Sequence, residues 1–316
     1  MITFLVSAFR CGMVLLFGAT GEILTEKSGH LNLGIPGVMC VGAACGCVAE
    51  SIYFTRMDGN IVGYVAVLIG ILATLVGGAL MGVIFSFFTV TLNANQNVSG
   101  LVLTTLGVGI SNYMVAQVEP LTYAPASKYF VAYLPFANNL GWFGKLFLSY
   151  GVMIYIALAV ALTCQWVLKR TKVGLHLRAV GENPATADAA GINVPLYRYV
   201  ATMIGCGIAG LGGLTFIMDY LLGSWEYVID SMGWLAVALV IFSIWRPNLA
   251  IVCSVIFGGF YVSSSYIPGI SLAAKELFKM LPYLVTTIVL IATSVRNRKE
   301  DQPPASLGLS YFREER

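Results

Sequence analysis

The residue types that most often carry catalysis are sparse in this chain, and their spacing does not suit it. The only Gly–Lys pair, Gly144–Lys145, lacks both the upstream glycine and the following Ser or Thr of a P-loop. Neither an HExxH nor a GxSxG motif occurs, and the two histidines, His30 and His176, are far apart in the sequence. We therefore predict no catalytic residue, no metal site and no cofactor bound by this chain. Any energy that its function needs would come from a partner or an ion gradient.

A GxGxxG pattern at Gly205–Gly210 is the one match to a nucleotide-binding motif. A dinucleotide site needs this pattern between a strand and a helix, with an acidic residue further on. Here it lies inside an apolar stretch, where Gly205, Ala209 and Gly213 share one helical face. Small residues on one face allow a second helix to approach closely, so we interpret the pattern as helix packing.

Polar side chains within or beside apolar segments are the better candidates for function, because burying them in a membrane is costly. Amide and hydroxyl groups suit an uncharged solute that forms hydrogen bonds, such as a nucleoside or a sugar. For Thr104 and Thr105, hydrogen bonding between helices is the favoured interpretation. The predicted path and gate residues are Glu22, Asn32, Asn95, Asn97, Ser99, Thr104, Thr105 and Asn112.

The elements that must position these side chains are membrane helices. Of 316 residues, 58% are apolar and only 10% are charged, whereas an average soluble domain is about 25% charged. A soluble fold of this size could not bury so much apolar surface. The net charge of +3 is too small to indicate a nucleic-acid binder. The composition therefore predicts an all-α polytopic membrane protein.

Long apolar runs predict nine spans, at about 20 residues per crossing. The third run could be one tilted helix or two short helices broken at Gly77–Gly78, so nine and ten spans both stay open. The segment 117–145 is rich in proline and aromatic residues and is expected to be an interfacial loop. The predicted spans are Phe4–Ala19, Leu33–Phe54, Ile61–Leu92, Val98–Ala116, Phe147–Leu168, Tyr199–Met218, Ser231–Trp245, Leu249–Tyr266 and Met280–Val295.

Lysine and arginine indicate which ends face the cytoplasm. The loop 169–198 holds the densest basic cluster between spans, and the tail after Val295 adds Arg296, Arg298 and Lys299. The positive-inside rule places both in the cytoplasm. Nine spans then put the N-terminus outside, and ten put it inside. The loop from Asp219 to Asp230, with Glu226 and Trp225 between, is acidic and is expected outside, where it either docks a binding protein or merely satisfies topology.

The cytoplasmic loop contains a predicted short helix. Asn183 is a good N-cap, Pro184 occupies the first helical position, and Gly191 supplies the C-terminal stop. A short capped helix is not needed to join two spans. It suits docking into a groove on a cytoplasmic partner, although a plain surface linker is the alternative.

Four strings give the chain a family resemblance. GLHLRAVGENPATADAAGINV, from Gly174, resembles the cytoplasmic coupling segment of bacterial ATP-binding-cassette (ABC) importer permeases for branched-chain amino acids, ribose, nucleosides and riboflavin. GEILTEKSGHLNLGIPGVM, from Gly21, is similar to the link between the first two spans of that group. NANQNVSGLVLTTLGVGI, from Asn93, and the glycine-rich span after Arg198 also resemble it. The similarity covers most of residues 10–295.

This resemblance implies a permease domain over 1–295, with the ABC importer permease fold, about nine or ten helices and a coupling segment at 169–198. It further implies a cytoplasmic ABC ATPase that binds ATP and Mg²⁺, a second homologous permease, and an extracytoplasmic substrate-binding lipoprotein. The implied coupling residues are Arg178, Gly181, Glu182, Asn183, Pro184, Ala187, Ala190 and Gly191.

Within the group, the chain most resembles nucleoside permeases that work with a basic-membrane-lipoprotein type receptor; sugar, riboflavin and branched-chain amino acid stay open. The alternative is an ion-driven secondary transporter, which predicts intramembrane ionisable residues and inverted repeats. We expect the bacterial plasma membrane, a cytoplasmic C-terminus and a disordered tail over 296–316, which is charged and contains Pro303–Pro304.

Overall fold

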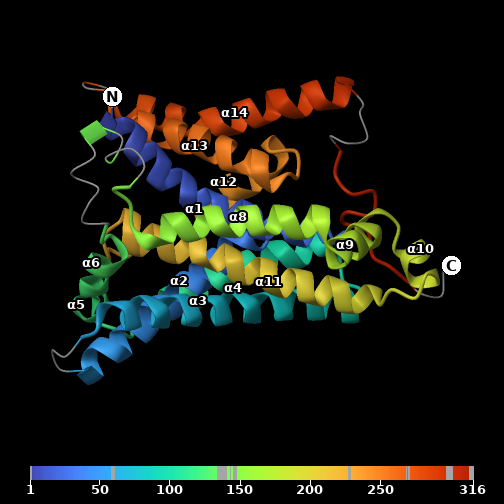
Figure 1. The fold of residues 1–316 in the computed structure, drawn as a ribbon, viewed down its shortest axis with the longest axis horizontal. Helices are drawn as coiled ribbons and strands as arrows, with labels where there is room; N and C mark the ends of the chain where they lie inside the picture. Colours follow the sequence, from blue (N-terminus) through green and yellow to red (C-terminus); the bar gives the residue numbers. More distant parts are fainter. Residues whose placement is uncertain are drawn as a thin grey trace.

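The computed structural model describes residues 2–57, 61–133, 141–142, 144, 148–226, 229–267, 269, 271–296 and 302–312. In this part of the chain all regular structure is helical, and most of the long helices run side by side (Figure 1). The long helices are α1 (Ile2–Glu26), α2 (Ile35–Met57), α3 (Gly63–Ser86, continued by a π turn at Phe87–Thr91), α4 (Gln96–Ala116), α8 (Val152–Arg170), α11 (Val194–Thr215, continued by a π turn at Phe216–Tyr220), α12 (Ile229–Phe242), α13 (Pro247–Ser263) and α14 (Leu272–Arg296).

Seven of these helices are long and apolar enough to cross a membrane, and α12 and α13 are shorter apolar helices. Each of the nine predicted spans therefore corresponds to one helix in the described residues. The possibility of a break at Gly77–Gly78 is wrong, because α3 passes through this pair without interruption. A Cβ atom at Gly77 would lie 2.5 Å from the Cys45 sulfur, and one at Gly78 would lie 2.5 Å from the Cys206 carbonyl oxygen. The two glycines serve close packing rather than a turn.

Helices α1, α2 and α11 form the centre of the bundle. α1 packs against α11 and α13, while α2 packs against α3, α4 and α11. α1 and α11 approach each other closely at Gly21 and Gly205, where a Cβ atom on Gly205 would lie 2.5 Å from the Gly21 carbonyl oxygen. Gly213, two turns further along α11, meets the Met39 carbonyl of α2 in the same way. This confirms that the GxGxxG pattern serves helix packing.

The two ends of the bundle carry different short helices (Figure 1). At one end lie α9 (Lys172–Glu182) and α10 (Pro184–Ala189) together with the C-terminal segment; we call this the α9–α10 end. At the other end lie α5 (Pro120–Tyr123), a 3₁₀ turn (Ala124–Ala126) and α6 (Ser127–Phe130). These short helices occupy part of the predicted interfacial loop; residues 134–140, 143 and 145 of that loop lie outside the described residues.

Candidate functional site

The predicted coupling segment forms two helices rather than one. The Thr171 hydroxyl caps α9 by accepting a hydrogen bond from the Gly174 N–H at 3.1 Å. The Asn183 side chain caps α10 by accepting from the Thr186 N–H at 3.0 Å. Pro184 begins α10, and Gly191, with φ of +83°, ends the segment in a backbone conformation that favours glycine. The helix predicted from Asn183 is confirmed, whereas α9 is an addition.

The inner side of this helix pair rests on the bundle through small residues. Val180 of α9, Ala187 of α10 and Val194 of α11 form a small apolar core. Gly181 lies directly against the α1–α2 connection, where a Cβ atom would be 2.3 Å from the Lys27 carbonyl oxygen. Of the predicted coupling residues, Gly181 and Ala187 are therefore buried contacts within the chain.

The outer side of the pair carries the remaining coupling candidates. Arg178 lies on the exposed side of α9, and Glu182 at its end is also exposed. Asn183, Ala190 and Gly191 are exposed as well, while Pro184 is half-buried. Among the coupling candidates, this projection from the bundle exposes one cation, one anion and a capped helix end.

Replacing Asn183 by alanine should destabilise α10 by about 1 kcal/mol, because an N-cap side chain satisfies a helix N–H that would otherwise lose its partner. We expect faster amide hydrogen exchange over 185–190. Asn193→Ala is a matched control, since Asn193 caps α11 through the Leu196 N–H at 3.1 Å. The 22-residue α11 is held by packing, so its interior should keep its protection. Equal protection of α10 in Asn183→Ala and the unaltered chain would contradict this role, and Asn183→Asp should restore it.

The C-terminal segment 302–312 lies across this helix pair and the bundle. The Ser306 hydroxyl and N–H both donate to the Gly181 carbonyl, at 2.6 and 3.0 Å. The Gly308 N–H donates to the Gly29 carbonyl at 3.2 Å. The Tyr311 hydroxyl donates to Asp188 Oδ2 at 2.8 Å. The prediction of a disordered tail is therefore wrong for 302–312, because these hydrogen bonds fix the segment; residues 297–301 and 313–316 lie outside the described residues.

Gln96 links the same segment to α4. Its side-chain oxygen accepts from the Leu31 N–H at 2.8 Å, and its amide nitrogen donates to the Leu309 carbonyl at 3.2 Å. Gln96 is only 1% exposed. The α1–α2 connection, α4 and the C-terminal segment are thus held together by one side chain that the predicted path does not include.

Two predicted path residues, Glu22 and Asn32, are fully buried and bonded to each other. Glu22 Oε1 accepts from the Asn32 N–H at 3.1 Å. The Asn32 side chain accepts from the Gly34 N–H at 2.9 Å and donates to the Cys206 sulfur at 3.3 Å. These bonds join α1, the α1–α2 connection and α11. The pair fixes the connection to the bundle and lies away from any open surface.

A second set of buried polar groups lies beside this pair, and the predicted path omits it. The Trp245 indole N–H donates to Glu26, which lies one turn after Glu22. His30 Nδ1 pairs with the Thr202 hydroxyl at 3.1 Å. Burial lowers the pKa of His30 well below its ordinary value, and the nearby Arg198 cation lowers it further, so the imidazole is neutral. The spacing of Glu22 and Glu26, four residues apart on one helix face, is the signal that could have indicated a buried cluster.

The other predicted path residues follow α4 and separate by depth and face. Asn95 is exposed and caps α4 through the Val98 N–H at 3.1 Å. The Thr104 hydroxyl donates to the Leu33 carbonyl at 2.9 Å, which ties α4 to the α1–α2 connection. Asn112, near the far end, accepts from the Trp225 indole at 3.1 Å. Asn97, Ser99 and Thr105 complete the set, with Asn97 and Thr105 exposed and Ser99 half-buried.

The acidic loop expected outside is only partly a surface feature. Asp219 is 1% exposed and lies in the π turn that ends α11. The Arg10 guanidinium of α1 donates to Asp219 Oδ1 at 2.8 Å and to its backbone carbonyl at 2.7 Å. Because this ion pair is buried, Asp219 is not one of the surface acids of the loop. Glu226 is exposed, and Asp230 is half-buried in the first turn of α12.

Comparison with known proteins adds the family. The family model described as branched-chain amino acid transport system, permease component, matches residues 4–290. The guanosine ABC transporter permease protein NupQ of Bacillus subtilis is 30% identical over 310 residues, which is 96% of this chain and 94% of the relative. The nucleoside ABC transporter permease protein NupC of Lactococcus lactis is 30% identical over 283 residues, covering 87% of each chain.

A third relative is a Haloferax volcanii protein, TsgC13, whose assignment as a glucose ABC transporter permease is provisional. It is 30% identical over 337 residues and covers 96% of each chain. The family match extends over nearly all of the membrane helices described above, and the relatives match along almost their whole length. The chain therefore belongs to the family of branched-chain amino acid type ABC transport permease components.

Proposed function

We propose that this chain is the permease subunit of an ATP-driven importer for nucleosides. The substrate class is supported by the similarity to the guanosine and nucleoside permeases, while the third relative makes a sugar the alternative. The observation that carries the mechanism is the α9–α10 projection, which offers exposed Arg178 and Glu182 on a base fixed to the bundle at Gly181. A separate ATPase seats on this projection, and its closure on ATP moves the bundle.

The α9–α10 end faces the cytoplasm in this proposal. Lys169, Arg170, Lys172 and Arg178 are all exposed there, as the positive-inside rule requires. The C-terminal segment 302–312 packs on the same end and shares its side of the membrane. The N-terminus of α1 lies at the opposite end (Figure 1), which fits an odd number of crossings.

The ATPase contact is tested by purifying the tagged chain from its native membrane in mild detergent and identifying the bound proteins by mass. We expect an ABC ATPase, a second homologous permease and a substrate-binding lipoprotein. Arg178→Ala with Glu182→Ala should release the ATPase and leave the second permease bound. Recovery of the chain without any ATPase, or undiminished ATPase in the double variant, would overturn the coupling proposal. Uptake of labelled guanosine, competed with unlabelled guanosine or glucose, distinguishes the two substrate classes.

The solute follows the exposed side of α4 in this proposal, along the partner permease. Asn97 and Thr105 lie there among apolar side chains, and a shallow groove of about 650 Å³ runs beside Thr105, from Val102 to Tyr113. Glu22, Asn32 and Thr104 do not line this path, because they fix the α1–α2 connection to the bundle and move with it. Ser99 and Asn112 lie along the same helix at its two ends.

Two neighbouring threonines separate the path from the scaffold. Thr105 is exposed, and its hydroxyl reaches only the Leu101 carbonyl of its own helix at 3.2 Å. Thr105→Val keeps the shape and removes the hydroxyl, so we expect slower nucleoside uptake with unchanged thermal stability. Thr104→Val loses the bond to the Leu33 carbonyl and should lower stability by about 1 kcal/mol. Normal uptake in purified, reconstituted Thr105→Val would remove Thr105 from the path.

A further inference from the structure

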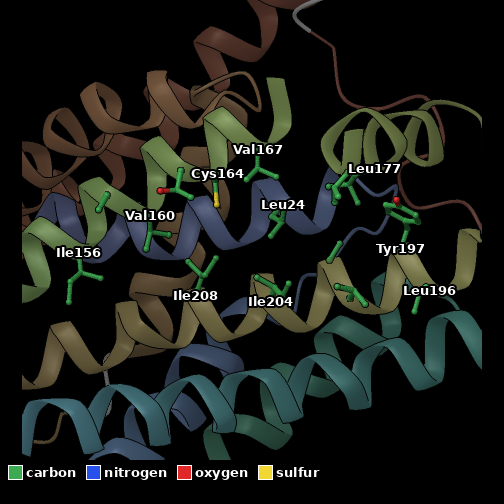
Figure 2. A pocket seen from close by; sticks show the side chains of 15 residues that line it. Leu24, Ile156, Val160, Cys164, Val167, Leu177, Leu196, Tyr197, Ile204 and Ile208 are labelled. Atoms are coloured by element: carbon green, nitrogen blue, oxygen red, sulfur yellow. The ribbon is translucent and has the colours of Figure 1, made fainter. Parts of the chain in front are cut away.

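A groove of about 640 Å³ opens between α8 and α11. Figure 2 shows Ile156, Val160 and Val167 on one wall and Ile204 and Ile208 on the other, with Leu24 of α1 between them. Its lining is almost wholly apolar. The residues with a polar atom or sulfur are Thr163, Cys164 and Tyr197. This groove lies on α8, α9 and α11, whereas the proposed solute path lies on α4, so the two are separate.

The groove is as long as one leaflet of a membrane. Its α8 wall extends from Ile156 to Val167, which at 1.5 Å per residue is about 16 Å. The hydrocarbon core of a bilayer is about 30 Å thick, so each leaflet contributes about half of that. Both walls belong to helices that are long and apolar enough to cross the membrane. An extended acyl chain from one leaflet therefore matches the groove in length and polarity.

Helix α9 closes one end of the groove. Val173 and Leu177 of α9 belong to its lining, and the His176 Nδ1 atom pairs with the Tyr197 hydroxyl at 2.9 Å beside them. A membrane-spanning helix of another subunit could not continue past this closure. A single hydrocarbon chain needs no such continuation, because its headgroup turns out of the groove at the membrane surface.

The closed end is also the positively charged end. Lys169, Arg170 and Lys172 stand at the α8–α9 junction, between the lining residues Val167 and Val173, and all three are exposed. Trp166, 60% exposed on α8, is of the type that lies at the level of lipid headgroups. Clustered cations beside a membrane helix attract anionic headgroups.

We propose that the α8–α11 groove binds one acyl chain of an anionic phospholipid, whose phosphate is held by Lys169, Arg170 and Lys172. The lipid belongs to the leaflet next to α9. By filling the space between α8, α9 and α11, it supports α9 from the membrane side.

The test uses the full chain with its co-purified partners, reconstituted in vesicles of equal parts phosphatidylglycerol and phosphatidylcholine. A trace of either lipid carries a photoreactive diazirine in one acyl chain, and labelled peptides are identified by mass spectrometry. We expect the phosphatidylglycerol probe to label α8 and α11 lining residues several-fold more than the phosphatidylcholine probe. Exchanging Lys169, Arg170 and Lys172 for glutamine together should abolish this preference and leave phosphatidylcholine labelling unchanged.

Ile204→Trp fills the groove from a half-exposed position, and it should reduce labelling of α8 several-fold in correctly assembled protein. Leu162→Trp is the matched control, since Leu162 is 57% exposed on α8 and does not line the groove. Equal labelling by both probes in the unaltered chain would overturn the proposal, as would uniform labelling along all exposed faces of α8. A cross-link from Cys164 to the second permease would also overturn it, because the groove would then be a subunit interface.

Discussion

Replacing Gly107 by valine is expected to prevent the permease from folding, whereas valine at Gly109 on the same helix is expected to be tolerated. At Gly107 a Cβ atom would lie 2.6 Å from both the Cα atom and the carbonyl oxygen of Gly37, so α4 and α2 cross backbone against backbone. At Gly109 no atom lies within 4 Å of the added Cβ. Helix pairs in membranes are held by such close packing, because lipid supplies no hydrophobic force between them.

The penalty at Gly107 exceeds ordinary overpacking, which costs about 1–3 kcal/mol when flexible side chains can adjust. Here the opposing atoms are backbone, so α4 would have to move away from α2. That movement would also stretch the bond from Thr104 to the Leu33 carbonyl, which is 2.9 Å long. Loss of the crossing therefore also releases the α1–α2 connection.

The measurement is the yield of monodisperse protein after detergent extraction, followed by its thermal midpoint. Gly107→Val should give little or no monodisperse protein, and Gly109→Val should give the normal yield and midpoint. Gly109 borders the groove on the exposed side of α4. Gly109→Val is therefore compared with Gly107→Val by yield and thermal midpoint, and not by uptake. Similar yields and midpoints for the two variants would show that the α2–α4 crossing is looser than the structure requires.

The membrane helices could be predicted from the sequence because the lipid itself imposes the pattern. Each apolar run had to be a helix of nearly fixed length. Helix ends were less predictable: α1 continues to Glu26, beyond the predicted end at Ala19. The extension holds two buried acids whose partners, the Asn32 N–H and the Trp245 indole, come from other segments. Hydropathy alone scores such residues as a helix end.

The coupling segment shows the same division between local and distant causes. The α10 cap could be predicted because Asn183, Pro184 and Gly191 act on their own neighbours in sequence. The ordering of 302–312 could not, since Ser306 binds Gly181 and Tyr311 binds Asp188, each more than a hundred residues away. The composition of the tail shows that it is polar, but it cannot predict contacts with such distant residues. The buried role of Gln96 was hidden for the same reason, because its partners Leu31 and Leu309 are far from it in the chain.

The eight predicted path residues form two groups, those bonded to another segment and those exposed on α4, and hydropathy cannot distinguish them. A polar side chain in a membrane helix can face a solute or satisfy a backbone group of another segment. Glu22, Asn32 and Thr104 do the second, through partners in the α1–α2 connection. Asn97 and Thr105 are exposed and stay available for the first. The sequence lists both kinds together, and only the fold separates them.

Gly181→Val is expected to abolish ATP-driven uptake while leaving the membrane bundle folded. A Cβ atom at Gly181 would lie 2.3 Å from the Lys27 carbonyl oxygen, a backbone atom that cannot move aside without moving the α1–α2 connection. Gly181 also accepts both hydrogen bonds from Ser306 through its own carbonyl oxygen. Valine would therefore separate α9–α10 from the bundle and from the C-terminal segment at once, so closure of the ATPase would move the projection without moving Glu22 and Asn32.

Leu175→Val is the matched control, because it places the same residue on α9 at a position that is 56% exposed. Both variants are purified with their partners and compared for bound ATPase, ATP hydrolysis and nucleoside uptake in vesicles. We expect Gly181→Val to lose uptake by about tenfold or more, a change of at least about 1.4 kcal/mol in coupling, with the normal thermal midpoint of the membrane bundle. Leu175→Val should match the unaltered chain in bound ATPase, ATP hydrolysis and nucleoside uptake. Normal uptake by Gly181→Val would show that α9–α10 does not transmit force through the contact of Gly181 with the Lys27 carbonyl. It would also show that the hydrogen bonds from Ser306 to Gly181 are not needed for coupling.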